Sequence, residues 1–565
     1  MADIALQPVL GMDGKADSQN QLTAYTASML EVKDAPNNAP NPRGKFRTAV
    51  VLVALYLAVF IAALDQTIVA TAIPTITSEL HSSSGYIWIG GAYLLANAAC
   101  GPIWAKVSDI WGRKSVLLTA VAIFFSASII CANAINIRML IAGRALQGAA
   151  GGGLFQLVLI TISDIFSVRE RSLYMGLIEC MWAIAGASGP ILGGTFAEKL
   201  TWRWCFWVNL PISGTTFFLL LLFLDVHNPR TSVKDGLRAV DWAGSVSLLG
   251  FALLFLLGLQ FGGVTFAWDS PQVICLIVIG ALISIIFVFC EKRLANYPLM
   301  PLSIFRNRSN VACLTLCFFH GMVFIGGEYY LPLYFQSVKG SSPLHSGILV
   351  IPLIITEALT GICVGIFIHR TGHFLELIYV GTILMTIGNG LYINFGVTTS
   401  TGMILGFQIV SGLGLGLLFE APLLAIQATV AQDDVATATS TFGFVRNLAT
   451  SLSVVIGGVI FQNSMNIQVP SLAKPPISLS PDIVELFAGG AAAANVEVVS
   501  SIHNAAQKLA VRKVFAWSLR NLWIFYTSLA ALAIIACVFI ERQHLSKVHV
   551  ETKTGIKEKE QQVMK

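Results

Sequence analysis

Apolar runs of about 20 residues recur along this 565-residue chain, and we count fourteen of them. A helix of that length is enough to cross the ~30 Å hydrocarbon core of a bilayer. Because the hydrocarbon core leaves no water to bond the backbone, each run is expected to be a helix. Only 12% of the residues are charged, compared with roughly 25% in soluble domains. This composition excludes a water-soluble enzyme, a disordered regulator and a nucleic-acid-binding protein.

The fourteen expected spans fall into groups of six, two and six. They cover residues 47–72, 84–105, 115–134, 138–162, 173–197, 204–224, 241–261, 271–291, 310–335, 345–368, 374–395, 401–430, 442–462 and 521–541. We therefore expect an all-α polytopic membrane protein with two six-helix lobes and two additional central helices. The expected divisions are a disordered cytosolic tail (1–46), an N-terminal lobe (47–224), a linker (225–240), the central helices (241–291), a second linker (292–309), a C-terminal lobe (310–541) that includes an outer loop (463–520), and a cytosolic tail (542–565).

Lysine and arginine in the short loops predict the orientation in the membrane. With the N-terminus inside, thirteen of them fall in inner loops and four in outer loops, so both termini are predicted to be cytoplasmic. The acidic N-terminal segment has no apolar core of the kind that a cleavable signal needs. The single N-glycosylation pattern, at Asn307, is placed inside and is expected to be unused.

The ten cysteines all fall within or at the ends of expected spans, and no Cys/His spacing suits a metal. We therefore expect neither a disulfide nor a metal site. In the outer loop, residues 502–519 have the apolar spacing of a helix. We interpret this segment as a surface helix resting in the headgroups, with a substrate lid as the alternative.

Two charged residues lie inside expected spans at the same depth. Asp65 is nine residues from Pro74, and Arg144 is six residues from Arg138. At about 1.5 Å per residue, both lie roughly 9–14 Å below the outer surface. A charge at this depth costs about 2.5–3.5 kcal/mol on insertion scales, so it tends to face a cavity or a partner. The pair is predicted to couple proton movement to a conformational change; the alternative is a permanent ion pair that holds the two helices together.

Closely spaced glycines in two spans predict tight helix packing. Gly148 and Gly152 lie four residues apart, a spacing that lets helices approach each other. The fifth span carries a longer series, Gly186, Gly189, Pro190, Gly193 and Gly194. A weak repeat also relates the basic turn at 105–114 to that at 365–373, and duplicated halves are typical of secondary transporters.

Four further acidic residues lie within spans: Glu179, Glu328, Glu357 and Glu420. Together with Gln147 they are the candidates for lining a cavity. Because burial favours the neutral form of a carboxyl group, each acid is a candidate hydrogen-bond donor, cation site or second proton site.

These residues resemble the motifs of the 14-span drug:proton antiporters of the major facilitator superfamily, and in particular fungal efflux pumps for toxins and other secondary metabolites. The segment Leu64 to Pro74 matches the first-span pattern L-D-x-T-I-V-x-x-A-x-P, with Ile73 where leucine is usual. The loop pattern G-x-x-x-D-R-x-G-R-K is matched at Asp109, Gly112, Arg113 and Lys114, and departs at Ala105 and Ile110. Further matches are Arg144, Gln147 and Gly148 in the fourth span and the glycine–proline series in the fifth.

The resemblance implies a two-lobed major facilitator fold that alternates between inward and outward openings, driven by proton influx and without a cofactor. It implies proton coupling by Asp65 and Arg144, a cytoplasmic latch of Asp109 with Arg113, and an antiporter motif in the fifth span. The implied activity is export of amphipathic small molecules, such as a toxin, secondary metabolite or drug. The implied setting is a monomer in the plasma membrane, or alternatively the vacuolar membrane, with no nucleic-acid partner.

The energetics permit this activity. One charge moving through 100 mV yields about 2.3 kcal/mol, each pH unit adds about 1.4 kcal/mol, and a tenfold solute gradient requires only about 1.4 kcal/mol. No nucleotide-binding P-loop pattern occurs. Two alternatives stay open, namely proton-coupled uptake of a metal chelate or nutrient and a sensor that has lost transport. An enzyme is not expected.

Overall fold

The structure is a computed structural model that describes residues 44–81, 85–263, 266–295, 297–475, 477–488, 491–496, 498–547, 549, 552 and 554–556. Residues 1–43 of the expected N-terminal tail, and part of the expected C-terminal tail, lie outside the described residues. The chain divides into two compact units, Met1–Leu52 and Val53–Lys565. The described part of the first unit, residues 44–52, contains the beginning of helix α2.

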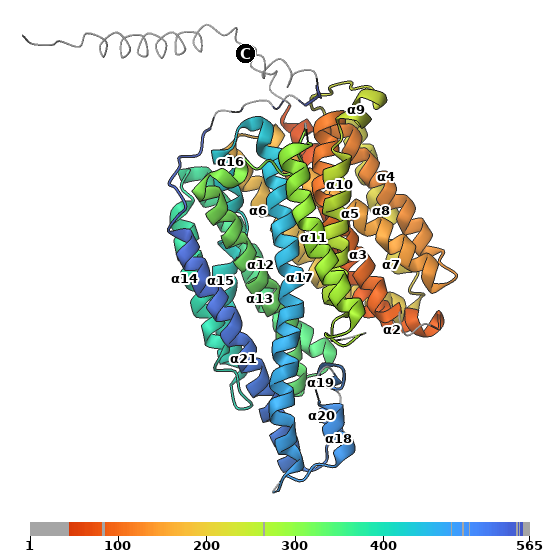
Figure 1. The fold of residues 1–565 in the computed structure, drawn as a ribbon, viewed down its shortest axis with the longest axis vertical. Helices are drawn as coiled ribbons and strands as arrows, with labels where there is room; N and C mark the ends of the chain where they lie inside the picture. Colours follow the sequence, from red (N-terminus) through yellow and green to blue (C-terminus); the bar gives the residue numbers. More distant parts are fainter. Residues whose placement is uncertain are drawn as a thin grey trace, which may run out of the picture. The chain divides into compact units, whose positions relative to one another are not determined.

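The described residues form helices and contain no β-strand (Figure 1). The long helices are α2 (Lys45–Glu79), α3 (Gly85–Trp111), α4 (Arg113–Ala132), α5 (Ile137–Ile165), α6 (Val168–Lys199), α8 (Asn209–Phe223), α10 (Trp242–Phe261), α11 (Pro271–Arg293), α12 (Arg308–Tyr334), α13 (Pro343–Thr371), α14 (Leu375–Tyr392), α15 (Thr401–Gly416), α17 (Val435–Gln468) and α21 (Ala505–Cys537). The shorter ones are α7 (Trp204–Trp207), α9 (Val233–Ala239), α16 (Ala421–Thr429), α18 (Pro481–Leu486), α19 (Ala491–Ala494) and α20 (Val498–Ser501).

Within the described residues, thirteen helical segments are long and apolar enough to cross a membrane. The one remaining expected span, 84–105, corresponds to α3, which has 27 residues but carries polar side chains such as Asn97 and Lys106. Helix α3 packs against α5, α10 and α17. Because protein rather than lipid covers much of α3, its surface can be less apolar than that of its neighbours. The all-α polytopic fold with fourteen spans is confirmed.

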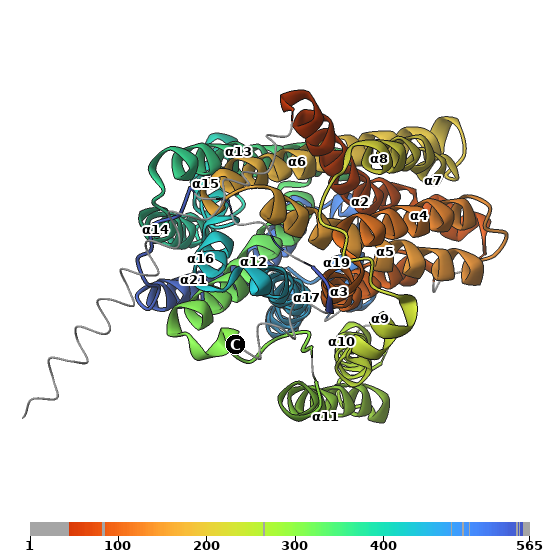
Figure 2. The same cartoon turned by 90° about the horizontal axis from the view of Figure 1, so that it is seen from above.

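Two pairs of helices form the seam between the N-terminal lobe (α2–α8) and the C-terminal lobe (α12–α21). Helix α6 lies beside α13, and α3 lies beside α17 (Figure 2). Helices α10 and α11 pack against each other, and α10 also contacts α3 and α17. The two additional helices therefore sit on the α3–α17 side of the seam.

One end of the helices carries most of the basic turns, and we call it the basic end. Here α3, α5 and α13 end, and α4, α6 and α14 begin. The two turns of the expected repeat both lie at this end, and each contains a glycine in the left-handed region, Gly112 (φ 88°) and Gly372 (φ 77°). Since other residues rarely adopt this conformation, the glycines permit the tight reversals that bring consecutive helices together.

The expected span 401–430 is a single crossing built from two helices. Helix α15 ends at Gly416, and α16 begins at Ala421 with Pro422 in its first turn. Proline provides no N–H donor and its ring clashes with the carbonyl group four residues earlier, here that of Leu418, so a continuous helix is interrupted at this point. Glu420 occupies the N-cap position of α16, so the break places a carboxyl group within the crossing.

The predicted surface helix at 502–519 is wrong in its orientation, because residues 505–519 belong to α21, which continues into the last span without interruption. The 33 residues of α21 contain neither glycine nor proline. The ring of Phe515 packs 6.0 Å from that of Phe461 in α17 and 5.8 Å from that of Phe487. The apolar side expected to rest in headgroups therefore packs on protein.

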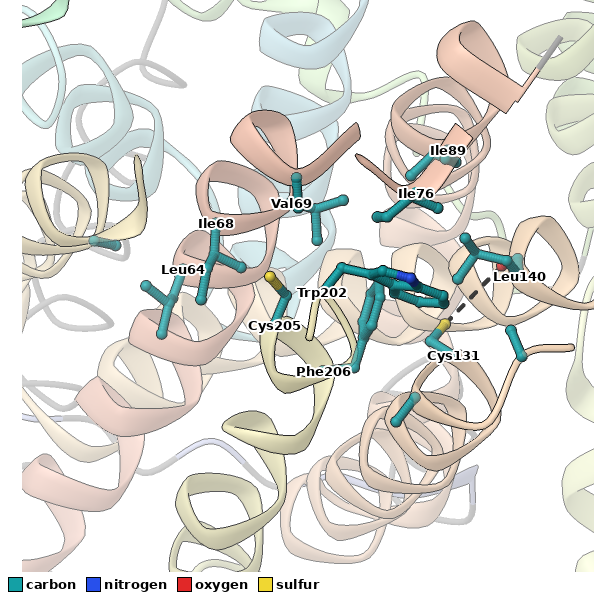
Figure 3. Close-up of a cluster of buried hydrophobic side chains, with 14 of the residues drawn as sticks. Leu64, Ile68, Val69, Ile76, Ile89, Cys131, Leu140, Trp202, Cys205 and Phe206 are labelled. Atoms are coloured by element: carbon teal, nitrogen blue, oxygen red, sulfur yellow. Dashed lines mark hydrogen bonds between the residues drawn. The ribbon is translucent and has the colours of Figure 1, made fainter. Parts of the chain in front are cut away.

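A cluster of fully buried side chains stabilises the N-terminal lobe away from the basic end (Figure 3). Leu64 and Ile68 of α2 pack here with Cys131 of α4 and with Trp202 and Phe206 around α7. Burying a large apolar side chain contributes about 1.5–3 kcal/mol. This cluster packs parts of α2 and α4 and the residues around α7 together near the charged pair predicted from the sequence.

Candidate functional site

Asp65 of α2 and Arg144 of α5 form a buried ion pair, with exposed fractions of 0% and 1%. The Arg144 Nη1 group donates to Asp65 Oδ2. The other carboxylate oxygen, Oδ1, accepts hydrogen bonds from Gln147 Nε2 at 3.1 Å and from Asn209 Nδ2 at 2.8 Å. Gln147 Nε2 also donates to Ser128 Oγ of α4 at 2.9 Å. Helices α2, α4, α5 and α8 are thus linked through one carboxylate and its donors.

Arg144 is enclosed by aromatic rings as well as by the carboxylate. Its guanidinium carbon lies 4.4 Å from the centroid of the Tyr93 ring and 5.9 Å from that of Phe206. Its Nε donates to the backbone oxygen of Ile89 at 3.0 Å. A cation over aromatic faces is stabilised by the ring quadrupoles, so part of the arginine's environment stays favourable even without the carboxylate.

The depth argument placed Asp65 and Arg144 at the same level, and the structure brings the two side chains together. Gln147, expected in a cavity, is instead fully buried beside Asp65. Asn209 and Ser128 were not predicted as members of this site. The available signal was a polar side chain within an apolar span, but nothing in the sequence indicates which faces of α4 and α8 meet α2.

The glycine series of α6 sets how closely this helix approaches α2. A Cβ added at Gly189 would lie 2.1 Å from Thr67 Oγ1, and one added at Gly193 would lie 2.0 Å from the backbone oxygen of Ile68. No side chain fits at these distances. The remaining members of the series do not make this contact. A Cβ added at Gly186 or Gly194 would meet nothing within 4 Å, and Pro190 is exposed.

At the basic end, Arg113 joins three helices of the N-terminal lobe. It is 1% exposed and lies between Asp109 Oδ1 (2.7 Å from Nη1) and Asp164 Oδ2 (2.6 Å from Nε). Gly112 forms the turn before it, and Lys114 is partly exposed after it. These contacts join α3, α4 and α5, so Arg113 and Asp109 brace helices of one lobe.

Two other arginines cross the seam between the lobes. From the start of α6, Arg169 Nε donates to the backbone oxygen of His369 at 2.7 Å, and its Nη2 donates to that of Arg370. These oxygens belong to the last turn of α13, where a positive charge is favoured by the helix dipole. Arg171 Nη1 donates to Gln427 Oε1 of α16 at 3.0 Å. In the sequence both arginines counted only toward membrane orientation, so their role at the seam was missed.

Close backbone packing accompanies these bonds between α6 and α13. Ser172 Oγ donates to the oxygen of Gly365 at 3.2 Å. A Cβ added at Gly176 would lie 2.7 Å from the backbone oxygen of Gly361. Farther from the basic end, a Cβ at Gly186 or Gly347 would meet nothing within 4 Å. The seam is therefore tight at the basic end.

The four predicted acids interact with one another at this seam. Glu179 of α6 interacts electrostatically with Glu420, Arg446 and Glu328, and Glu357 interacts with Glu328 and Glu179. Glu357 and Glu420 are 6% and 3% exposed, and within the described part of the chain each has one carboxyl oxygen without a hydrogen-bond partner. Four acids from both lobes therefore lie near one another, and two of them, Glu179 and Glu420, also interact with Arg446.

The arrangement of these groups does not suit a metal ion. Among the described residues, no group of three or more His, Cys, Asp or Glu side chains is placed to hold one. All ten cysteines are free thiols. What the two clusters offer chemically is exchange of protons and hydrogen bonds to a polar group of a solute.

Comparisons with known proteins identify relatives over most of the chain. A family model described as Major Facilitator Superfamily matches residues 55–454. The efflux pump dotC of Dothistroma septosporum is 44% identical over 508 residues, which cover 90% of this chain and 87% of dotC. The MFS-type transporter ppz2 of Metarhizium majus is 41% identical, with 96% and 92% covered. The efflux pump FUS6 of Gibberella moniliformis is 38% identical, with 92% of each chain covered.

Solved structures are similar in fold at low sequence identity. The human organic anion transporter MFSD10 (TETRAN) aligns with a TM-score of 0.54 at 16% identity and covers 85% of this chain and 99% of its own. The proton:xylose symporter XylE aligns with a TM-score of 0.53 at 13% identity, covering 92% and 99%. At these identities the similarity concerns the fold alone.

Proposed function

The chain belongs to the major facilitator superfamily of transporters, and we propose that it exports amphipathic small organic molecules in exchange for protons. It is a multi-pass membrane protein and a transporter rather than an enzyme. The observation that carries the proposal is the buried carboxylate of Asp65, held by Arg144, Gln147 and Asn209. Relatives named as efflux pumps support the direction of transport.

Protonation of Asp65 changes the forces on four helices at once. The neutral carboxyl group no longer offsets the charge of Arg144, and it no longer offers two anionic acceptors to its donors. Removing one partner of a buried ion pair typically costs about 3–5 kcal/mol because the other charge stays uncompensated. A rearrangement of α2 against α5 and α8 that gives Arg144 a new partner lowers this cost. Proton uptake is thereby coupled to movement of the helices.

The described conformation is closed at the basic end, which we assign to the cytosol. Arg169, Arg171 and the contact of Gly176 with Gly361 hold α6 against the C-terminal lobe at this end. We infer that Asp109, Gly112, Arg113 and Lys114 support this gate by bracing α3, α4 and α5. Opening the cytosolic side then requires the α6 contacts to break while the brace remains intact.

The acids between the lobes are the proposed contacts for the solute and for a second proton. Glu179 and Glu328 are half-buried, and Glu357 and Glu420 lie deeper. A protonated carboxyl group donates a hydrogen bond to a carbonyl or hydroxyl group of an amphipathic solute, and its ionised form does not. The other features that we propose are a monomer in the plasma membrane, with the vacuolar membrane as the alternative, both termini in the cytosol, and the proton gradient as the only driving force.

The test is transport by the purified protein in vesicles with an imposed pH gradient, with the uncharged dye Nile red as the probe. We expect the dye to move against its own concentration gradient when the compartment that it enters is the acidic one. An uncoupler should abolish this movement. The variant Asp65→Asn should abolish gradient-driven movement, whereas Glu198→Gln, an exposed acid on α6, should preserve it.

The outcomes separate the proposal from its alternatives. Normal gradient-driven movement in Asp65→Asn would make the buried pair a structural link only. Dye movement with the proton rather than against it would indicate uptake. Binding of a panel of amphipathic solutes without any movement would indicate a sensor.

A further inference from the structure

The described residues that follow α21 contact the helices of the protein. Ile540 is 4% exposed, and the Glu541 N–H donates to Ser309 Oγ at the start of α12 at 3.1 Å. Arg542 Nη2 then pairs with Glu376 Oε1 in the first turn of α14. The first contacts of this segment are therefore with the C-terminal lobe.

The next residues cover the turn between α13 and α14. The Leu545 N–H donates to the backbone oxygen of Gly372 at 3.5 Å, and the Leu545 side chain is only 2% exposed. The rings of His544 and His373 stack with centroids 5.8 Å apart. The ends of a chain are usually exposed. Because the Leu545 side chain is buried, this segment is docked on the protein rather than free.

The same segment then reaches the N-terminal lobe. The oxygen of Ser546 accepts a hydrogen bond from the Arg169 N–H at 3.3 Å. Farther along, the Gly555 N–H donates to the backbone oxygen of Asp109 at 3.0 Å. Arg169 begins α6 and Asp109 lies near the end of α3, so both contacts are at the basic end.

Two threonines add contacts on either side of the seam. Thr552 Oγ1 accepts from Gln432 Nε2 of the C-terminal lobe at 2.8 Å, and Thr554 Oγ1 donates to the oxygen of His227, after α8, at 3.4 Å. Their exposed fractions are 7% and 5%. The contacts thus alternate between lobes along the segment.

We propose that the described residues from Ile540 to Ile556, which we call the C-terminal strap, occupy a surface of their own chain. Both lobes form this surface together when the basic end is closed. The strap binds this surface and holds the two lobes together. The proposal rests on the proposed function only in that the basic end is taken to open during transport.

The reason is geometric linkage. Gly372 and Gln432 belong to one lobe, Arg169 and Asp109 belong to the other, and His227 lies in the linker that follows α8. If the lobes separate at the basic end, one strap cannot keep both sets of contacts. A segment that binds only the closed state raises the population of that state, and by reciprocity a closed state binds the strap more tightly. Release of the strap must then favour opening.

The test is hydrogen–deuterium exchange of the full-length protein in lipid nanodiscs, followed by mass spectrometry. Peptides covering 540–547 should exchange at least tenfold more slowly than a free peptide of the same sequence. In Leu545→Glu, which places a charge in the buried position, this protection should disappear. Peptides covering 168–176 and 361–372 in that variant should exchange at least threefold faster, because the gate opens more often.

Lys547→Gln is the matched control, since Lys547 is exposed on the same segment, and it should behave as the original protein does. A chain ending at Gln543 is the second variant, because it removes the rest of the strap without a substitution in the helices. It should reproduce the faster exchange of the gate.

Exchange of residues 540–547 at the free-peptide rate in the original chain would overturn the docking. Loss of the protection with no change at the gate would overturn the linkage. Neither readout requires a transported solute, so a failure of proton-driven export leaves the result on the strap intact.

Discussion

Gly176→Ala should open the basic end without disturbing either lobe. The added Cβ would lie 2.7 Å from the backbone oxygen of Gly361, which is 0.7 Å short of the 3.4 Å at which ordinary contact begins. The atom it meets is backbone of the other lobe, so no side chain can rotate away. The clash exists only while α6 and α13 are packed together at this level.

The magnitude follows from packing energetics. Overpacking by one methyl group typically costs about 1–3 kcal/mol. Alanine is also the better helix former by up to about 1 kcal/mol, but this gain is present in both conformations and cancels in their equilibrium. A bias of 1–3 kcal/mol corresponds to a shift of about 5–150-fold toward the open state.

Hydrogen–deuterium exchange of the ends of α6 and α13 measures this shift, and thermal unfolding in detergent checks the fold. Gly186→Ala is the matched control, since it lies on the same helix and its Cβ would meet nothing within 4 Å. Gly365→Ala should act as Gly176→Ala does, because its Cβ would lie 2.6 Å from the oxygen of Ser172. Equal exchange in Gly176→Ala and Gly186→Ala would refute the reasoning.

Two further predictions concern the opposite half of the N-terminal lobe. Gly193→Ala should lower thermal stability and transport, because its Cβ would lie 2.0 Å from the oxygen of Ile68. Gly194→Ala should leave both unchanged, because its Cβ would meet nothing within 4 Å. Equal melting temperatures of these two variants would contradict the packing. The hydrogen bond from Arg203 at 2.7 Å lowers the pKa of Glu79 from its usual value of about 4.3. The stability that this pair contributes is therefore complete above the usual pKa of Glu79, and it is lost as the pH falls through the lowered pKa. The melting temperature of the protein should therefore exceed that of Glu79→Gln at pH 6 and match it near pH 2, and a difference that persists at the lower pH would argue against this pair.

The fold was predictable because its signals are local. Each span can be recognised from the length of its own apolar run. The depth of a charged residue along a span can be counted from the ends of that span, which is why the sequence could predict that Asp65 and Arg144 lie side by side. The break before Ala421 had a visible signal in Pro422, but a long apolar run masked it. For α21, the absence of glycine and proline between residues 505 and 537 was the signal for one continuous helix.

The seam was not predictable, because its contacts join residues far apart in the chain. Arg169 and Arg370 are 201 positions apart, and Arg171 and Gln427 are 256 apart. A basic residue near a membrane surface looks the same in sequence whether it anchors orientation or caps a helix of the other lobe. Asn209 presents the same difficulty at the Asp65 site, where rotation of α8 about its axis decides which residue faces the carboxylate.

Helix α10 touches both α3 and α17, one from each lobe. A helix in this position cannot keep both contacts fixed while the two bodies tilt, so it must slide over at least one of them. While it stays there, α10 covers the α3–α17 side of the seam, and the α6–α13 side has no such added helix among the described contacts. The added helix pair thus makes the two flanks of the transporter unequal toward the surrounding bilayer.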